Sequence, residues 1–408
     1  MTTFIHAADL HLGAPLTGLA RRSETACGIM AQAKNKSFAT IVDRAIEDTV
    51  DILLLSGDIF DKASTNLRTE FFAARTLSRF VDAGGRVFII AGNHDAHTTY
   101  LSRLGELPGV TLFGSEAAEQ FDLKELGVAI TGQSFGARVE ARDLAASYPA
   151  PLPGRFNIAL LHSSCEGSEH HDVYAPCSVA NLAASGYDYW ALGHIHEAQI
   201  VQKNPWIVYA GCPQGRSSRE VGEKGVFKGV VNDNRLSKLA FIETSAIRWE
   251  RLVITLDNNA REAALDGLIA DAALKCAQTA SDKPVICRIK LCGATPLNAA
   301  LRARSIVEWT QAAQDACDGL HPPGIFVEML TIETTPIEKS ISWDPAFLDC
   351  LYETAKDPEL TADIETLLAS VAKKAKPDIV FSSAQTLIQQ ALAIIEARVI
   401  DAGEDDAH

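Results

Sequence analysis

Five times in the first 200 residues, a short apolar run of strand length ends in aspartate, asparagine or histidine. Strand-like runs separated by amphipathic helical stretches are typical of layered α/β domains. One such stretch spans residues 38–46, where apolar residues recur at helical spacing. In open α/β sheets, the carboxyl ends of parallel strands share an edge at which ligands bind. We therefore expect the five polar clusters to meet at one sheet edge.

Each polar cluster contains residue types that bind divalent cations. A histidine-x-histidine pair in an extended segment places both imidazoles on one side, which suits a metal ligand pair. Any single cluster also fits a polar turn, and His162 alone favours a buried core histidine. The recurrence favours a metal site instead. The clusters are Asp9-Leu10-His11, Gly57-Asp58-Ile59-Phe60-Asp61, Gly92-Asn93-His94-Asp95, His162 and Gly193-His194-Ile195-His196.

The hydrophobic pattern divides the chain into three parts. Residues 1–250 carry the alternating α/β pattern, residues 251–335 form a small α/β cap, and residues 336–408 are helical. Within the first part, the strand-like runs between residues 206 and 242 predict an antiparallel closing segment. Within the cap, residues 298–313 predict one helix. An apolar stripe over residues 384–399 indicates a packed helix face.

Charge and cysteine content exclude several classes of protein. The net charge is −15, and residues 251–408 contribute 14 − 24 = −10 of it, so this part is not a free-standing nucleic-acid binder. The nine cysteines include no Cys-x-x-Cys pair, which argues against a zinc ribbon or a disulfide framework and indicates a cytoplasmic protein. No apolar run approaches the ~18 residues that a membrane span requires.

As a set, the five clusters resemble those of the calcineurin-like metallophosphoesterases, in particular the SbcD-type DNA repair exonucleases. The run from Tyr187 to His196 is especially similar to the bacterial YhaO-like branch. The resemblance covers residues 1 to about 230, while the cap and the helical tail match that family only in order and size. It implies a four-layer α/β sandwich with a small α/β cap and C-terminal helices.

The resemblance also implies a two-metal centre that hydrolyses DNA phosphodiester bonds, as an exonuclease or endonuclease in DNA repair. Asp58 would bridge the two ions, and a hydroxide activated between them would attack phosphorus. The ligand mix suits manganese, iron or zinc, and the family points to Mn²⁺. The first ion would be held by Asp9, His11, Asp58 and His196, and the second by Asp58, Asn93, His162 and His194.

Three further residues of these clusters are candidates for catalysis. The resemblance gives His94 the role of stabilising the transition state or protonating the leaving oxygen, with Asp95 fixing its orientation. Some relatives have a histidine at the position of Asp61, so the carboxylate here is expected to act by supporting its neighbours.

A serine hydrolase is the strongest competing interpretation of the site. Gly132-Gln133-Ser134-Phe135-Gly136 matches the nucleophile elbow Gly-x-Ser-x-Gly and follows an apolar run. The downstream histidines outside the metal clusters are His170, His171, His321 and His408. A structural loop is the alternative for this segment. Two alternatives concern function instead: a phosphodiesterase of nucleotides or other small molecules, and a non-catalytic regulatory subunit of an ATPase.

Binding partners are expected at two places. Arg216, Arg219 and Lys224 follow the last metal cluster and are candidates for contact with a DNA backbone, although a solvated hairpin is at least as good an explanation of them. The chain lacks the phosphate-binding motif Gly-x-x-x-x-Gly-Lys-[Ser/Thr], so ATP-driven steps need another protein. In the resembling family, C-terminal helices dock onto an SMC-like coiled-coil ATPase. That partner is expected here, a homodimer is left open, and no membrane is expected.

Overall fold

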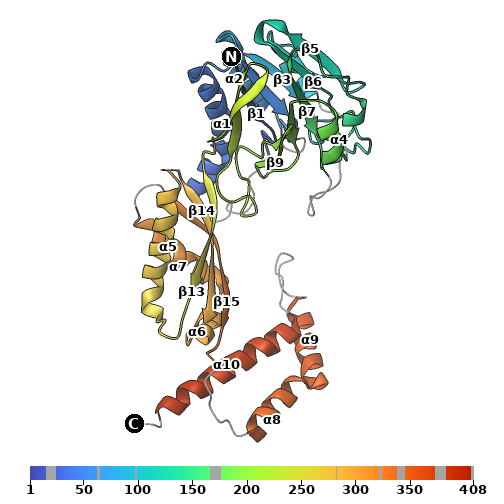
Figure 1. Ribbon diagram of the computed structural model, residues 1–408. Coiled ribbons are helices and arrows are strands. Elements are labelled where there is room, and N and C mark those ends of the chain that lie inside the picture. The colour runs from blue at the N-terminus through green and yellow to red at the C-terminus, as the bar shows by residue number, and fades with distance from the viewer. Residues whose placement is uncertain are drawn as a thin grey trace. The chain divides into compact units, whose positions relative to one another are not determined.

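The computed structural model (Figure 1) describes residues 1–14, 24–61, 65–96, 99–165, 176–281, 283–320, 324–337, 345–372 and 383–405. The chain divides into two compact units. One comprises Met1–Glu250 with Ala280–Ile286, and the other comprises Arg251–Thr279 with Cys287–His408. The predicted separation of a cap from a helical tail near residue 336 stays a prediction.

Two six-stranded sheets form most of the first unit. The first has the order β12-β11-β1-β2-β3-β4, in which β1 to β4 are parallel and β11 and β12 are antiparallel additions. The second has the order β5-β6-β7-β8-β10-β9, with β6, β7, β8 and β10 parallel. The strands are β1 (Thr2–Ala7), β2 (Ile52–Ser56), β3 (Arg86–Ile90), β4 (Val110–Leu112), β5 (Glu119–Leu123), β6 (Val128–Gly132), β7 (Phe156–His162), β8 (Tyr189–Gly193), β9 (Gln199–Lys203), β10 (Trp206–Tyr209), β11 (Gly225–Asn232) and β12 (Arg235–Glu243).

Helices cover the outer faces of the two sheets, which pack against each other. Phe4 and Leu54 of the first sheet meet Ile130 and Leu160 of the second, and all four are fully buried or nearly so. On the other face of the first sheet, Leu53 belongs to a core shared with α1 and α2. On the second, α4 shares a core with β8 and β10. The helices of this unit are α1 (Glu24–Glu47), α2 (Leu67–Asp82), α3 (Tyr100–Gly105) and α4 (Val179–Ala184), with 3₁₀ turns η1 (Lys124–Leu126) and η2 (Ala145–Ser147).

This order of helix, sheet, sheet and helix confirms the four-layer sandwich. Burying each such Leu, Ile or Phe side chain contributes roughly 1.5–3 kcal/mol, so the packed layers fix where the strands end. Two expectations were wrong in detail. The five clusters follow strands of two sheets rather than one: β1, β2 and β3 in the first, β7 and β8 in the second. Residues 206–209 form β10, which pairs in parallel with β8 and antiparallel with β9 in the second sheet, whereas β11 and β12 pair antiparallel in the first sheet as expected. The apolar pattern reveals a strand but not its pairing partner.

The second unit contains most of a three-stranded sheet in the order β13-β14-β15. Its strands are β13 (Arg248–Thr255), β14 (Val285–Ala294) and β15 (Ile325–Thr335), and its first helices are η3 (Glu262–Ala264), α5 (Leu265–Thr279), α6 (Asn298–Ala303) and α7 (Ile306–Asp318). The single helix expected over residues 298–313 is two helices. Ser305 and Glu308 form a capping box that starts α7, because their side chains satisfy the free amides of a helix beginning.

Three helices complete the described part of this unit: α8 (Pro345–Ala355), α9 (Pro358–Ala372) and α10 (Ala384–Asp405). The predicted apolar stripe is confirmed in part: Ala384, Ile388 and Leu392 are buried, Leu387 is half-buried and Ala391 is exposed, and α10 packs on α6, α8 and α9. The side chains of Ile395 and Val399 lie outside the described residues. Across the described ranges, no helix combines the length and apolarity that a bilayer crossing demands.

Candidate metal centre

The loops after β1 and β2 are joined by backbone hydrogen bonds. The amide of Asp9 donates to the carbonyl of Gly57 at 3.0 Å, and the amide of His11 donates to that of Asp58 at 2.9 Å. These bonds continue the parallel pairing of β1 with β2 beyond the strands. Two clusters that are far apart in the sequence are therefore held side by side.

Four of the predicted ligands have left-handed backbone conformations. The φ angle is 54° at Asp9, 44° at His11, 53° at Asp58 and 94° at His194. Such conformations cost roughly 1–3 kcal/mol each in non-glycine residues and persist only where the surroundings impose them. The hydrogen bonds between the loops supply that constraint. The strained backbone conformations thus occur at residues whose side chains would bind the metal.

Two of these clusters begin with a glycine because neighbouring atoms lie where the Cβ atom of any other residue would be. A Cβ atom at Gly92 would collide with the carboxylate of Asp58, and one at Gly193 would collide with the carbonyl oxygen of Ser56. The loops that carry the clusters approach each other too closely there for a side chain. Glycine thus lets the clusters after β3 and β8 approach the one after β2.

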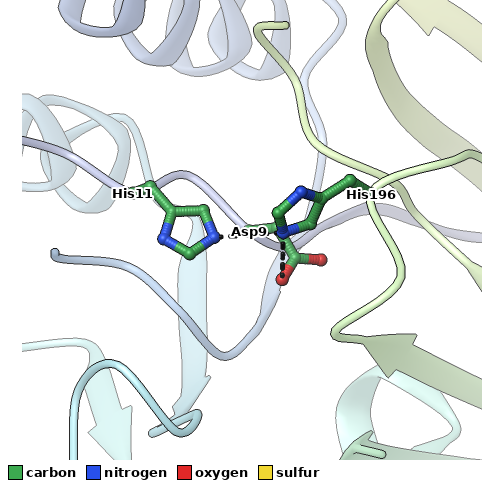
Figure 2. Close-up of side chains that lie close together, drawn as sticks. All are labelled: Asp9, His11 and His196. Carbon is green, nitrogen blue, oxygen red and sulfur yellow. Dashed lines mark hydrogen bonds and ion pairs between the residues drawn. The ribbon is translucent and has the colours of Figure 1, made fainter. Parts of the chain in front are cut away.

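One group of ligand atoms consists of Asp9, His11 and His196 (Figure 2). One ligand atom of each lies within 4.8 Å of the others. The Nε2 atoms of His11 and His196 are 3.2 Å apart, and Nε2 of His196 is 3.9 Å from an oxygen of Asp9. Carboxylate and imidazole atoms converge here on a space that a divalent cation fits.

A second group forms around Asp58, which also reaches the first. Its Oδ2 atom lies 3.6 Å from Nε2 of His11 and 3.6 Å from Nε2 of His162. His162 donates from Nδ1 to the carbonyl of Ser56 at 2.9 Å, and its Nε2 atom lies 3.0 Å from Oδ1 of Asn93. Because a carbonyl can only accept, Nδ1 carries the proton and the lone pair of Nε2 faces two oxygens. A cation between Nε2 of His162, Oδ2 of Asp58 and Oδ1 of Asn93 would accept a lone pair from each of these three atoms.

His194 belongs to the same centre. Its amide donates to both carboxylate oxygens of Asp9 at 3.1 Å, and its ring centroid lies 5.3 Å from that of His162. All seven predicted metal ligands are thus linked by contacts within one region. The linking residues come from both sheets.

The charges of the centre also fit a cation. Burial and the charge of Asp58 raise the pKa of Asp9 well above its usual range, and burial raises the pKa of Asp58. Burial lowers the pKa of His162 to about 3, so its imidazole is neutral and able to bind metal. Two buried carboxylates side by side are unfavourable without compensating positive charge. Bound divalent cations would supply it.

His94 occupies the accessible side of the centre. Its side chain is 34% exposed, whereas that of Asp58 is 3% exposed. Its ring lies 4.7 Å from that of His11, and Nδ1 is 3.7 Å from a carboxylate oxygen of Asp61. An imidazole that faces both the metal ligands and solvent is placed to meet a substrate.

Asp95 makes hydrogen bonds that brace the loop after β2. Its carboxylate accepts from the amides of Ile59, Phe60 and Gly92 at 2.9–3.1 Å. Burial and the charge of Asp58 raise its pKa to about 7. The expected orientation of His94 by Asp95 stays a prediction, and the structure places the carboxylate of Asp61 beside the His94 ring.

Two residues of the centre gave no sequence signal. Glu220 accepts from Nδ1 of His196 at 2.7 Å, and the buried Lys34 donates to the carbonyl of His11 at 3.1 Å. Burial opposes the ionisation of Glu220, but its bonds with His196 and Arg216 hold its pKa well below the usual range. Burial lowers the pKa of Lys34 to about 7. Neither residue follows a strand with a polar cluster, so only the folded structure identifies them.

The three predicted DNA-binding residues have different environments. Arg216 contacts Glu220 and lies 2.8 Å from Nδ1 of His196, so it forms part of the centre. Arg219 is exposed. Lys224 is only 9% exposed, which disfavours a direct phosphate contact. The expected solvated hairpin is a loop between β10 and β11 that packs against the metal centre.

Ser134 lacks the environment of a nucleophile. Its hydroxyl donates to the carbonyl of Phe113 at 2.6 Å and accepts from the amide of Ala91 at 2.9 Å, and the residue is 5% exposed. Both bonds tie β3 and β4 to the loop after β6. The histidines proposed to serve it, His170, His171, His321 and His408, lie outside the described residues. This environment supports the structural interpretation.

Comparison with known proteins identifies the family. Residues 2–198 match the calcineurin-like phosphoesterase family, and residues 249–335 match the middle domain of metallophosphoesterase YhaO. The uncharacterized metallophosphoesterase YhaO of Bacillus subtilis is 34% identical over 301 residues, which cover 72% of each chain.

Two groups of DNA-processing proteins are more distant relatives. The DNA double-strand break repair protein Mre11 of Methanopyrus kandleri is 26% identical over 60% of each chain. The SbcD subunit of the nuclease SbcCD of Bacillus subtilis is 26% identical over 54% of this chain and 62% of its own length. The closer similarity to YhaO, over both parts of the chain, shows that this protein belongs to the calcineurin-like metallophosphoesterases and to their YhaO-like branch.

Proposed function

We propose that this protein hydrolyses phosphodiester bonds of DNA with two divalent cations, preferentially Mn²⁺. The observation that carries the proposal is Asp58, whose carboxylate lies 3.6 Å from an imidazole nitrogen of each ligand group. One cation would be held by Asp9, His11, Asp58 and His196. The other would be held by Asp58, Asn93, His162 and His194. When bound, such a pair supplies an acidified water and neutralises charge on the phosphate.

The protein's own side chains would control the proton and the substrate. His94 is accessible and reaches the centre, so it can donate a proton to the leaving oxygen. Asp61 lies beside its ring and can hold its orientation. Arg216, next to the centre, offers a guanidinium to a phosphate oxygen.

DNA as the substrate is supported by the distant similarity to Mre11 and to the SbcD subunit of SbcCD. Those relatives are named for DNA repair and nuclease activity, and the relative with the greater similarity is uncharacterized. A small phosphodiester would use the same metal chemistry. The substrate class is therefore the point that the experiment must decide.

The test is hydrolysis by the purified chain of end-labelled single- and double-stranded DNA and of bis-p-nitrophenyl phosphate, with Mn²⁺ or with a chelator. The proposal expects Mn²⁺-dependent cleavage of DNA that chelator abolishes. Cleavage of the small diester alone would assign a small-molecule phosphodiesterase. Absence of cleavage of every substrate by metal-loaded protein would favour a regulatory subunit.

We also propose that the C-terminal helices bind an SMC-like ATPase. Leu367 and Val371 of α9 and Tyr352 of α8 are large apolar side chains with 43–66% of their surface exposed. Such exposed apolar side chains suit a protein partner. Truncation at Pro336 should abolish co-purification with that ATPase, and a complex that survives truncation would contradict the docking proposal.

A further inference from the structure

A basic groove lies between α1 and α2, which pack against each other on the outer face of the first sheet. Its volume is about 1260 Å³, which exceeds the roughly 300–1,000 Å³ of ordinary small-molecule pockets. Three cations line it, namely Lys36 from α1 and Arg68 and Arg75 from α2. Among the lining side chains that the structure describes, none carries a carboxylate. The groove is thus a positive site on a protein of net charge −15.

Within the part of the chain that the structure describes, the three groove cations are unpaired, whereas two other arginines of the same helices form ion pairs. Arg44 of α1 pairs with Asp48 at 2.9 Å, and Arg79 of α2 pairs with Asp43 at 2.6 Å. Lys36, Arg68 and Arg75 are exposed and form no ion pair with a described residue. Their charges remain available to an anionic ligand. The other polar lining residues (Gln32, Asn35, Asn66 and Thr69) carry amide or hydroxyl groups able to donate hydrogen bonds.

The groove lies next to the metal centre. Lys34, between lining residues Gln32 and Asn35 on α1, donates to the carbonyl of the ligand His11. At the start of α2, Asn66 lines the groove and follows Asp61 by five positions. Helix α1 thus contributes residues to the groove and also contacts a loop of the centre, and α2 follows another loop of the centre in the sequence.

We propose that the α1–α2 groove binds the phosphodiester backbone of the nucleic-acid strand whose end enters the metal centre. The inference rests on the proposed function, because it assigns the path of that substrate. Unpaired Lys and Arg side chains are the groups that neutralise successive phosphates and displace their counterions. The volume of the groove and its three cations, unpaired among the described residues, fit an extended polyanion better than a compact phosphate.

A second copy of the chain is the alternative occupant. Leu67 and Phe71 of α2 are 62% and 54% exposed and would suit a protein surface. In a twofold contact the same patch meets itself, so the groove cations of one copy would face those of the other. Repulsion between these like charges favours a nucleic-acid strand over a second copy of the chain as the occupant of the groove.

The test reverses two groove charges, in Arg68→Glu with Arg75→Glu. The matched control is Arg235→Glu with Lys238→Glu, which makes the same charge change at exposed positions of β12. Binding of a fluorescent 30-nucleotide strand is measured in a His94→Gln background between 50 and 200 mM NaCl. We expect the groove variant to lose at least about tenfold in affinity, with a salt slope smaller by about 1.4, and the control to lose much less.

Further measurements separate the outcomes. Both variants, with His94 intact, should hydrolyse bis-p-nitrophenyl phosphate at the parent rate, which shows that the centre is preserved. Equal affinity and slope in the groove variant and the control would overturn the groove while leaving the proposed function standing. A parent that binds DNA through the groove without cleaving it would contradict only the proposed function. Sedimentation of the parent as a dimer and of the groove variant as a monomer would assign the groove to a second copy and overturn the inference.

Discussion

Nδ1 of His196 lies 2.7 Å from Oε1 of Glu220, and the opposite ring nitrogen, Nε2, lies among the metal-ligand atoms. A carboxylate behind an imidazole accepts the Nδ1 proton and leaves the lone pair on Nε2 for a metal. Arg216 binds the same carboxylate and keeps it charged. Glu220 therefore positions His196 without touching the metal space itself.

Replacing Glu220 by Gln should weaken the metal site built from Asp9, His11 and His196. The expected loss in affinity is about 10–100-fold, because an amide accepts the imidazole proton less well than a carboxylate. Metal content measured by mass spectrometry during Mn²⁺ titration should show one weakened site and one retained site. Glu223→Gln, a change at an exposed position, is the control. Two unchanged sites would contradict the positioning role.

The substitution His94→Gln should separate catalysis from metal binding. We expect turnover of DNA, whose alkoxide leaving group needs a proton, to fall by about 10²–10⁴-fold, since a general acid contributes about that much. Metal content should stay at the parent level, because Asp9, Asp58 and the other proposed ligands remain. A variant that keeps full turnover would indicate that His94 has no part in proton transfer.

Removal of the metal should lower the stability of the unsubstituted protein, and the size of this effect should depend on Asp58. A ligand at 100 times its dissociation constant adds about 2.7 kcal/mol of stability, so chelator should lower the Tm of the Mn²⁺-loaded protein. In Asp58→Asn this difference should largely disappear, because both cations lose a shared ligand. Asp122→Asn changes a carboxylate that pairs with Arg155 outside the centre and should keep the full chelator effect. A chelator effect retained in Asp58→Asn would contradict a bridging carboxylate.

Acid should destabilise the fold partly through His6, a core histidine whose Nδ1 contacts the hydroxyl of Tyr189. Burial lowers its pKa from 6.5 to about 3. Between these two pH values the unfolded chain binds a proton that the folded protein does not, so stability falls as pH decreases below 6.5. The contribution is up to about 1.4 kcal/mol per pH unit. Urea unfolding of His6→Gln at several pH values should give a shallower acid slope, and an unchanged slope would refute this role.

Ser134→Ala should leave turnover intact and reduce stability by about 1–3 kcal/mol, because the buried hydroxyl satisfies the carbonyl of Phe113 and the amide of Ala91. Turnover and urea unfolding of the variant check both expectations. A fluorophosphonate should fail to label the parent at this serine. Labelling that abolishes turnover would restore the serine-hydrolase interpretation.

The sequence alone predicted the strands and the ligand clusters after them. Local rules suffice there, because an apolar run ending in Gly-Asp or Gly-His marks both a strand end and a tight approach. Five such clusters could be recognised together as a metal site, and the four-layer fold was expected from the resemblance that they carry.

Only the tertiary structure decided which sheet each strand joins and which distant residues support the ligands. β10 joins β8 in parallel, whereas β11, the next strand in the sequence, joins the other sheet antiparallel to β1. Glu220 reaches His196 from a loop, and Lys34 reaches His11 from a helix, without a local motif. Strand patterns encode which side chains are buried but not their partners. Hydrogen bonds between segments far apart in the sequence depend on how the layers pack, and this is the physical reason that they could not be predicted.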